Sequence, residues 1–173
     1  MVIMKNRNFL FLTLGKFISL LGTSFQDFAL SLYVLKITGS STKFASVLAI
    51  SIIPQLILGP ISGVLADWFD RKKMVIICDV LSFLTVLCGC ASFLYKNSLS
   101  MGDIYIIVTV LSIISVAFSS ASSTIIPSIV KKEDLTSANS INSFVQSISN
   151  ILGPVLSGTI LGFFGIFPVL IIN

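Results

Sequence analysis

The chain has 173 residues, of which 55% are hydrophobic and only 10% charged, and its formal net charge is +4 without any histidine. Soluble domains carry about 25% charged residues, so this composition, with a mean hydropathy of +1.04, excludes an ordinary soluble protein and predicts an all-α membrane protein. The lack of histidine and of any nucleophile–base pair or phosphate-binding loop argues against an enzyme. We therefore expect no catalytic residues, no metal, no cofactor and no nucleic-acid partner.

Five apolar segments are long enough to cross a membrane, which takes about twenty helical residues for a hydrocarbon core of roughly 30 Å. They cover residues 9–35, 44–66, 74–95, 104–130 and 137–162. A sixth apolar run begins near Phe164 and reaches Asn173. Ten helical residues cover only about 15 Å, so we expect a sixth transmembrane helix that is incomplete at this position.

The distribution of lysine and arginine predicts the orientation of the chain in the membrane, because cytoplasmic loops are enriched in these residues. Seven basic residues fall on the side of the N-terminus, at positions 5, 7, 71–73, 131 and 132, whereas three fall on the other side, at positions 36, 43 and 96. We expect a cytoplasmic N-terminus and a multi-pass protein of the cell membrane. The first apolar run lacks a convincing signal-peptide cleavage site and continues too far for one.

The first segment places polar residues on one helical face, including Lys16, Ser24 and Asp27. Lys16 and Asp27 are eleven residues apart, about 16 Å along a helix, so they do not pair directly. We expect Lys16 to extend its ammonium toward the cytoplasmic surface. An intramembrane carboxylate normally faces a cavity or a partner, so Asp27 is either a coupling residue or a structural hydrogen-bond acceptor to a neighbouring helix.

The later segments differ in polarity. In the third, we expect Asp79 to form a salt bridge with one of the basic residues at 71–73. The fourth has serines at positions 112, 115, 119 and 122 along one face. From this face we select Ser115 and Ser119, which together with Ser24 and Asp27 of the first segment form our set of candidate cavity or coupling residues. The fifth has a continuous stripe of polar or small residues that must face another helix or a water-filled path, because unpartnered amides are costly in lipid. That stripe comprises Asn139, Asn142, Ser143, Gln146, Ser149, Asn150, Gly153 and Ser157.

An internal repeat is indicated by the sequence ILGP, which occurs at residues 57–60 and again at 151–154. The two copies lie in segments of opposite direction, as expected for a 3+3 inverted repeat of the kind found in many transporters. Glycines follow at four-residue spacing in both, as Gly59–Gly63 and Gly158–Gly162. Such pairs permit close approach of helix backbones, either for sliding or for static packing.

The turn between the second and third segments reads GVLADWFDRKK at residues 63–73. It resembles the loop 2–3 signature, often called motif A, of the major facilitator superfamily. The residues that match are Gly63, Leu65, Ala66, Asp67, Arg71 and Lys72, whereas Trp68 stands in place of a basic residue and Asp70 in place of a glycine. The resemblance implies that Gly63, Asp67, Arg71 and Lys72 control the conformational change. The D-x-F-D-R form is similar to that of macrolide- and siderophore-exporter-like members.

Gly153, Pro154 and Gly158 resemble the fifth-helix antiporter signature, or motif C, of the same superfamily, with serines at positions 149 and 157 where glycines are more usual. That signature implies export. The fourth segment lacks the membrane arginine of motif B, which draws attention to Asp27 as the coupling residue. Members of the family have twelve spans, so the resemblance implies that residues 1–173 form an N-terminal six-helix bundle, incomplete at its C-terminus, without the second six-helix half.

The resemblance therefore implies a secondary active transporter that exports a small amphiphilic compound, drug-like or siderophore-like, by alternating access coupled to an ion gradient. Its expected partners are the small-molecule substrate, a coupling ion that we take to be a proton, the lipid bilayer, and either the missing C-terminal half or a second copy. The alternatives are a truncated, non-transporting membrane subunit and a homodimeric small transporter or pore.

Overall fold

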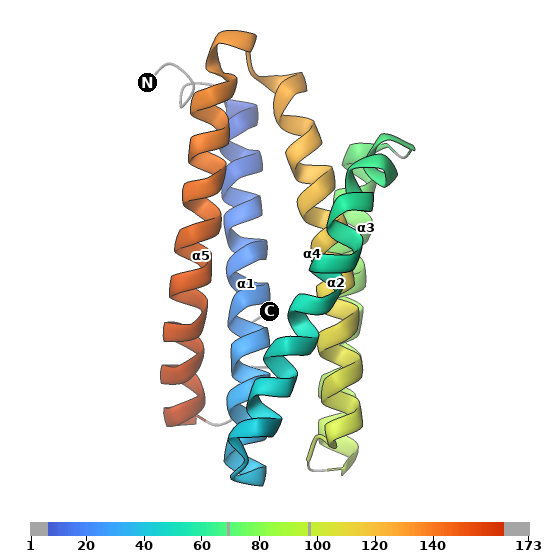
Figure 1. Cartoon of the computed structure of the whole chain (residues 1–173), viewed down its shortest axis with the longest axis vertical. Coiled ribbons are helices and arrows are strands. Elements are labelled where there is room, and N and C mark those ends of the chain that lie inside the picture. Colours follow the sequence, from blue (N-terminus) through green and yellow to red (C-terminus); the bar gives the residue numbers. More distant parts are fainter. Residues whose placement is uncertain (1–6, 69, 97, 165–173) are drawn as a thin grey trace.

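The computed structural model of the chain is a bundle of long helices (Figure 1). The structure describes residues 7–68, 70–96 and 98–164, and the side chains at these positions other than 62–68 and 71. The helices are α1 (Arg7–Thr38), α2 (Ser41–Trp68), α3 (Arg71–Lys96), α4 (Met101–Ile129) and α5 (Leu135–Phe164), with a short 3-10 helix, η2 (Lys132–Asp134), before α5. The expected all-α fold class is confirmed, since these ranges contain no strand.

Each long helix contains a stretch apolar and long enough to cross a membrane. Helices of 26 to 32 residues are about 39–48 Å long, which exceeds the roughly 30 Å of the hydrocarbon core. The five predicted segments therefore correspond to α1 to α5, with the helices extending a few residues further at most ends. The sixth predicted segment lies outside the described residues.

Successive helices run in opposite directions along the long axis of the bundle (Figure 1). The first residues of α1, the α2–α3 turn and the η2 connection gather at one end, which we call the basic end because it holds Lys72, Lys73, Lys131 and Lys132. The α1–α2 and α3–α4 connections lie at the opposite end. The clustering of positive residues at one end is the arrangement on which the predicted orientation depends.

Local sequence explains where the helices stop and start. Gly39 adopts a φ of +63° directly after α1, a left-handed conformation that glycine adopts without steric cost, and its N–H donates to the carbonyl of Leu35 at 2.8 Å. Asp70 caps α3, because its Oδ1 accepts from the N–H of Lys72 at 3.1 Å. Asp70, which stands where the motif A signature usually has glycine, thus accepts a hydrogen bond from a backbone N–H at the start of α3 that has no partner within the helix.

Helix packing follows the pattern that an inverted repeat of three helices predicts. The most extensive contacts are between α1 and α5 and between α2 and α4, and α3 packs on α4. If the first and second three-helix units are exchanged, the α1–α5 contact becomes the α4–α2 contact. A large apolar cluster, with Phe25, Leu30 and Val34 of α1 and Ile104 and Val108 of α4, fills the end opposite the basic end.

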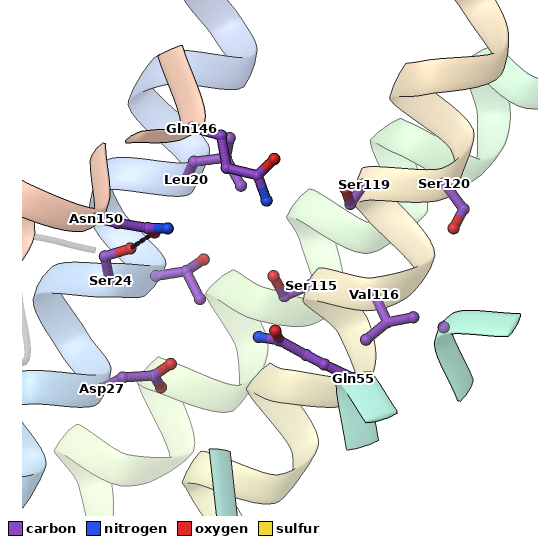
Figure 2. Close-up of a pocket in the computed structure, with 12 residues that line it drawn as sticks. Leu20, Ser24, Asp27, Gln55, Ser115, Val116, Ser119, Ser120, Gln146 and Asn150 are labelled. Carbon is purple, nitrogen blue, oxygen red and sulfur yellow. Dashed lines mark hydrogen bonds between the residues drawn. The ribbon is translucent and has the colours of Figure 1, made fainter. Parts of the chain in front are cut away.

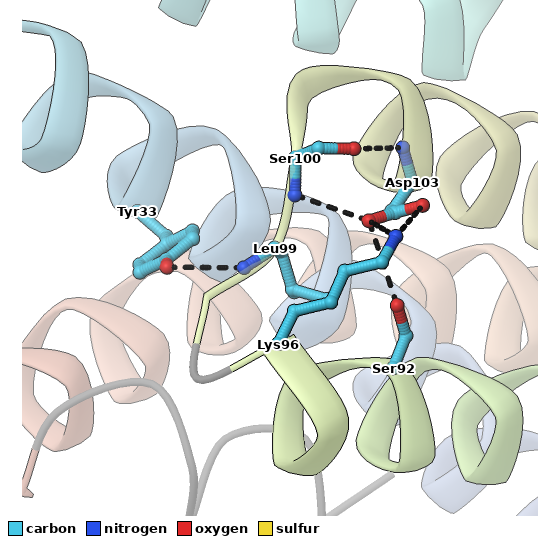
Figure 3. A network of polar contacts seen from close by, with 6 residues as sticks. All are labelled: Tyr33, Ser92, Lys96, Leu99, Ser100 and Asp103. Carbon is cyan, nitrogen blue, oxygen red and sulfur yellow. Dashed lines mark hydrogen bonds and ion pairs between the residues drawn. The ribbon is translucent and has the colours of Figure 1, made fainter.

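A network of polar contacts fastens the α3–α4 connection (Figure 3). The Ser100 side chain accepts from the N–H of Asp103 at 3.2 Å, and the Asp103 carboxylate accepts from the N–H of Ser100 at 3.1 Å. Lys96 forms an ion pair with Asp103 at 3.0 Å. The N–H of Leu99 donates to the Tyr33 hydroxyl at 3.4 Å, which ties the connection to α1. Together these contacts begin α4 at Met101 and hold it beside α1 and α3.

We predict that Ser100→Ala lowers the free energy of unfolding by about 1 kcal/mol, because it removes the capping acceptor of α4. The loss is measured by circular dichroism along a dodecyl sulfate titration of the protein in mixed micelles. Ser98→Ala is the matched control, since its hydroxyl makes no hydrogen bond in the part of the chain that the structure describes, and it is expected to change stability by less than about 0.5 kcal/mol. Equal losses in the two variants would contradict the capping role.

Candidate substrate cavity

A polar cavity of about 300 Å³ lies between α1, α2, α4 and α5 and is partly open, since several of its lining residues are exposed (Figure 2). Four helices supply its lining: Leu20, Thr23, Ser24 and Asp27 of α1, Gln55 and Gly59 of α2, Ser115, Val116, Ser119 and Ser120 of α4, and Gln146 and Asn150 of α5. The four residues predicted as cavity candidates from the sequence are all among them. The cavity is bounded toward one end by the large apolar cluster and toward the basic end by a second apolar cluster that contains Phe9, Ile126 and Ala138.

Asp27 is the ionisable side chain among these lining residues, and its carboxylate points into the cavity (Figure 2). The residue is half-buried, and its Oδ1 is a buried atom with no hydrogen-bond partner among the described residues. A buried acceptor left without a partner costs about 1–3 kcal/mol, and more when it is charged. The geometry therefore presents a carboxylate oxygen that is available to a proton, a cation or a donor group entering the cavity.

Amide side chains complete the polar lining. The Ser24 hydroxyl donates to Oδ1 of Asn150 at 3.1 Å, which links α1 to α5 at the cavity wall. Gln146 lies one turn earlier on the same face of α5, and Gln55 extends from α2 toward the space between α1 and α4 (Figure 2). Amides both donate and accept hydrogen bonds, so these three side chains are suited to a ligand rich in hydroxyl and carbonyl groups.

The serine face of α4 divides into two parts. Ser115 and Ser119 line the cavity, whereas Ser112 and Ser122 are buried outside it. The Ser112 hydroxyl donates to the main-chain carbonyl of Ser51, and this contact joins α4 to α2. The stripe predicted on the fifth segment divides into three parts: Gln146 and Asn150 line the cavity, and Ser149, Gly153 and Ser157 are buried. The first three members, at positions 139, 142 and 143, are neither buried nor part of the cavity lining.

Among the predicted glycines, Gly153 permits a close helix contact. A Cβ atom built on it would lie 2.6 Å from Cβ of Ser24 and 2.9 Å from the backbone nitrogen of Phe25. The same construction at Gly59 or Gly162 meets no described atom within 4 Å, and at Gly158 it meets only Leu32 Cδ1 at 3.9 Å. Within the described bundle Gly59, Gly158 and Gly162 therefore make no such close contact, and the close-approach interpretation of these three glycines stays a prediction.

Most of the loop 2–3 signature falls on positions whose side chains lie outside the described residues. This applies to Gly63, Asp67 and Arg71, whose backbone ends α2 and begins α3. Lys72 is exposed, and its N–H bonds to the Asp70 carboxylate. The controlling role of the signature stays a prediction. Pro154 lies within α5, which continues through it to Phe164.

Two charged residues of the membrane segments make contacts that differ from those predicted. Lys16 does not extend to the surface: its side chain is 4% exposed, and its Nζ lies 3.4 Å from Oγ of Ser123 on α4. Asp79 makes no ion pair with Lys72 or Lys73 in the described structure, and its Oδ1 accepts from the Ser19 hydroxyl at 3.5 Å. The side chain of Arg71, the third predicted partner, lies outside the described residues. The reason is direction, because Asp79 faces α1 while both lysines are exposed at the start of α3.

Gln55 is one of the cavity residues that were not predicted from the sequence. It is the single amide in the apolar segment 44–66, and an isolated amide in a membrane segment is itself a signal, since it is costly in lipid without a partner. The ILGP repeat nearby drew attention to the glycines of that segment instead. Ser120 and Val116 were also not predicted, because a position on the cavity wall requires the rotation of α4 about its axis.

Comparison with known proteins identifies the family. The sequence profile of the Major Facilitator Superfamily matches residues 12–173. The chain belongs to the Major Facilitator Superfamily. Its relatives in this superfamily are transporters rather than enzymes, which confirms the expectation of a non-enzyme, and five apolar helices make it a multi-pass membrane protein.

Three relatives illustrate the similarity. The chain is 33% identical over 121 residues to the uncharacterized MFS-type transporter YfiS of Bacillus subtilis, covering 70% of this chain and 28% of that protein. It is 27% identical to macrolide efflux protein A of Streptococcus pyogenes, over 83% of this chain and 35% of the relative. It is 26% identical to the staphyloferrin A transporter of Staphylococcus aureus, over 85% of this chain and 37% of that relative.

The chain thus spans about a third of the length of the curated superfamily members that it matches. No solved structure gives a significant match. The resemblance to macrolide- and siderophore-exporter-like members of the superfamily is supported at the level of sequence, since relatives named for both kinds of compound are found.

We predict that Gly153→Ala destabilises the protein by about 1–3 kcal/mol, because the added methyl group overlaps Ser24 and the backbone of Phe25 in the α1–α5 contact. Gly59→Ala is the matched control from the other copy of the repeat. Its methyl group enters open space, and replacing a helical glycine gains up to about 1 kcal/mol. Both free energies come from the same dodecyl sulfate titration. Similar effects of the two substitutions would show that Gly153 does not set the contact.

Proposed function

We propose that this chain forms the first six-helix half of a secondary active transporter that exports a small amphiphilic compound by alternating access. Export is coupled to an ion gradient, with the proton as the coupling ion and Asp27 as the group that binds it. The observation that supports this most strongly is the polar cavity inside an apolar bundle, lined by four helices and containing a carboxylate oxygen without a partner.

The cost of polar groups in a membrane supports a transport role over a structural one. A structural aspartate would accept hydrogen bonds from a neighbouring helix, because an unpartnered buried carboxylate is destabilising. The Asp27 oxygen has no such partner among the described residues, and Gln55, Gln146 and Asn150 are arranged around the same space. A site that holds polar groups ready for a ligand explains why these residues occur in so apolar a chain.

The compound that we propose is drug-like or siderophore-like. Relatives named as macrolide efflux protein A and staphyloferrin A transporter match most of this chain. The lining combines amides and hydroxyls with the apolar side chains of Leu20 and Val116, which suits an amphiphilic molecule that is rich in oxygen.

Alternating access requires a second half that rocks against this one. The outward faces of α2 and α5 expose large apolar side chains, including Leu56 and Ile57 of α2 and Ile151 and Val155 of α5. We place the second six-helix half on these faces and the loop 2–3 signature at the junction between the halves. In this arrangement the basic end lies in the cytoplasm of a cell-membrane protein, in line with the charge bias of the connections.

We predict that Asp27→Asn abolishes efflux driven by a pH gradient, because an amide neither binds nor releases the proton. The measurement is accumulation of a radiolabelled substrate, drug-like or siderophore-like, in inside-out membrane vesicles that contain the complete two-half transporter. Glu133→Gln is the control, since it also removes one carboxylate but from an exposed position in η2. Unchanged pH-dependent accumulation by Asp27→Asn would remove Asp27 from the mechanism.

We also predict that Gly63→Leu stops transport while membrane insertion remains normal, because a large side chain at the junction resists sliding of one half on the other. Insertion is measured by the yield of extractable, monodisperse protein, and transport by the same vesicle assay. The control is Val64→Leu, a neighbouring change between apolar residues of similar size. Normal transport by Gly63→Leu would refute the role of the junction.

A second copy of the chain, bound to the same exposed faces of α2 and α5, would give the alternative function, a homodimeric small transporter or pore. Cysteine pairs placed on these faces distinguish the two. Efficient cross-linking of two 173-residue chains that also transport the radiolabelled substrate favours the dimer. Cross-linking to the second half alone favours the two-half transporter, and cross-linking without transport favours a non-transporting subunit.

A further inference from the structure

A buried lysine lies one helical turn beyond the cavity, toward the basic end. Lys16 occupies the same face of α1 as Leu20, which lines the cavity, and Ser123 occupies the same face of α4 as Ser119, which lines it opposite. Four residues correspond to about 6 Å along a helix. The Lys16–Ser123 contact therefore lies about one helical turn from the cavity lining, between the same two helices and toward the basic end.

The charge of Lys16 is not compensated in the described structure. Its ammonium has three donors, and its side chain is 4% exposed, yet its hydrogen-bond partner is the neutral hydroxyl of Ser123, at a long 3.4 Å. The ion pair found among the described residues joins Lys96 to Asp103 at the other end of the bundle. A buried cation without an anion is destabilising, so this position is built to receive an anionic group.

Access to that position is provided by Ser123, which is exposed although Lys16 is buried. An anion that approaches past the Ser123 hydroxyl meets one donor at the rim and the ammonium behind it. Carboxylates and phosphates accept several hydrogen bonds at once and form their shortest bonds with cationic donors. Asp27, eleven residues further along α1 and thus about 16 Å away, is too far to occupy the site itself.

We propose that Lys16 and Ser123 form an anion-binding subsite at the inner end of the cavity, which takes a carboxylate group of the transported compound. This inference rests on the proposed function and specifies the substrate class as an organic anion. It separates two tasks along α1, because the anionic group of the substrate binds at Lys16 while Asp27 remains free for the coupling cation.

The test measures binding rather than transport, so that it is independent of the proposed coupling. The 173-residue chain is placed in phosphatidylcholine nanodiscs and titrated with citrate, a small carboxylate probe, by isothermal titration calorimetry. Lys16→Met is expected to weaken citrate binding at least tenfold and Ser123→Ala about threefold, whereas Lys16→Arg keeps the affinity within about threefold. Lys36→Met, which removes an exposed lysine at the opposite end of the bundle, is the matched control and is expected to change nothing.

Three results would overturn the proposal. The first is a dissociation constant for Lys16→Met equal to that of Lys36→Met, and the second is an absence of citrate binding to the unaltered chain. The third is tighter binding of glycerol phosphate, the soluble headgroup of a phospholipid, than of citrate, with the same dependence on Lys16, which would assign the site to a lipid phosphate. Any of these three results would refute the anion site without affecting the Asp27 transport test. Conversely, if Asp27→Asn leaves transport unchanged while citrate still binds, the proposed proton coupling is refuted and the anion site is not.

Folding of the variants is verified by the dodecyl sulfate titration before binding is measured. Lys16→Met is expected to be as stable as the unaltered chain or more so, because it removes an uncompensated buried charge and keeps an unbranched apolar stem. A variant that is more stable and yet has lost citrate affinity separates a binding residue from a structural one.

Discussion

The hydrocarbon interior of a membrane offers no water to polar groups, and the structure of this chain depends on that constraint throughout. Helices satisfy the backbone, and many hydroxyls return a hydrogen bond to their own helix, as Thr23 does to the carbonyl of Ser19 and Ser31 to that of Asp27. Longer polar side chains have no such local solution. Four of them, Asp27, Gln55, Gln146 and Asn150, lie around one space between four helices, which is the cavity.

The cavity persists because the helices around it are fastened on both sides by different means. On one side, the absence of a side chain at Gly153 lets α5 approach α1, and the Ser24–Asn150 hydrogen bond joins the same two helices beside it. On the other, the Ser112 hydroxyl bonds to the Ser51 carbonyl and joins α4 to α2. Apolar clusters pack the bundle toward each end, and the polar space lies between these two pairs of helices.

Charge is distributed along this space in an ordered way. Asp27 and Lys16 lie on one face of α1, eleven residues apart, and neither has an ionic partner in the described structure. Helical spacing already placed them on one face, but it predicted an exposed ammonium at Lys16. The prediction was wrong because it considered α1 alone, whereas α4 offers Ser123 as a hydrogen-bond acceptor inside the bundle. Asp79 likewise bonds to Ser19 on a neighbouring helix rather than to Lys72 or Lys73 of its own helix.

The amino-acid sequence by itself determined the number, length and alternating direction of the described helices, because hydrophobic length and the placement of basic residues act locally along the chain. It also indicated Asp27, Ser115 and Ser119 as cavity residues, since a polar residue in the middle of a membrane helix must face either a neighbouring helix or a cavity. The tertiary structure alone decided which glycine makes a close contact, that Gln55 joins the cavity, and where the Lys16 ammonium points. These outcomes depend on the rotation and crossing of whole helices, which periodicity within a single segment does not specify.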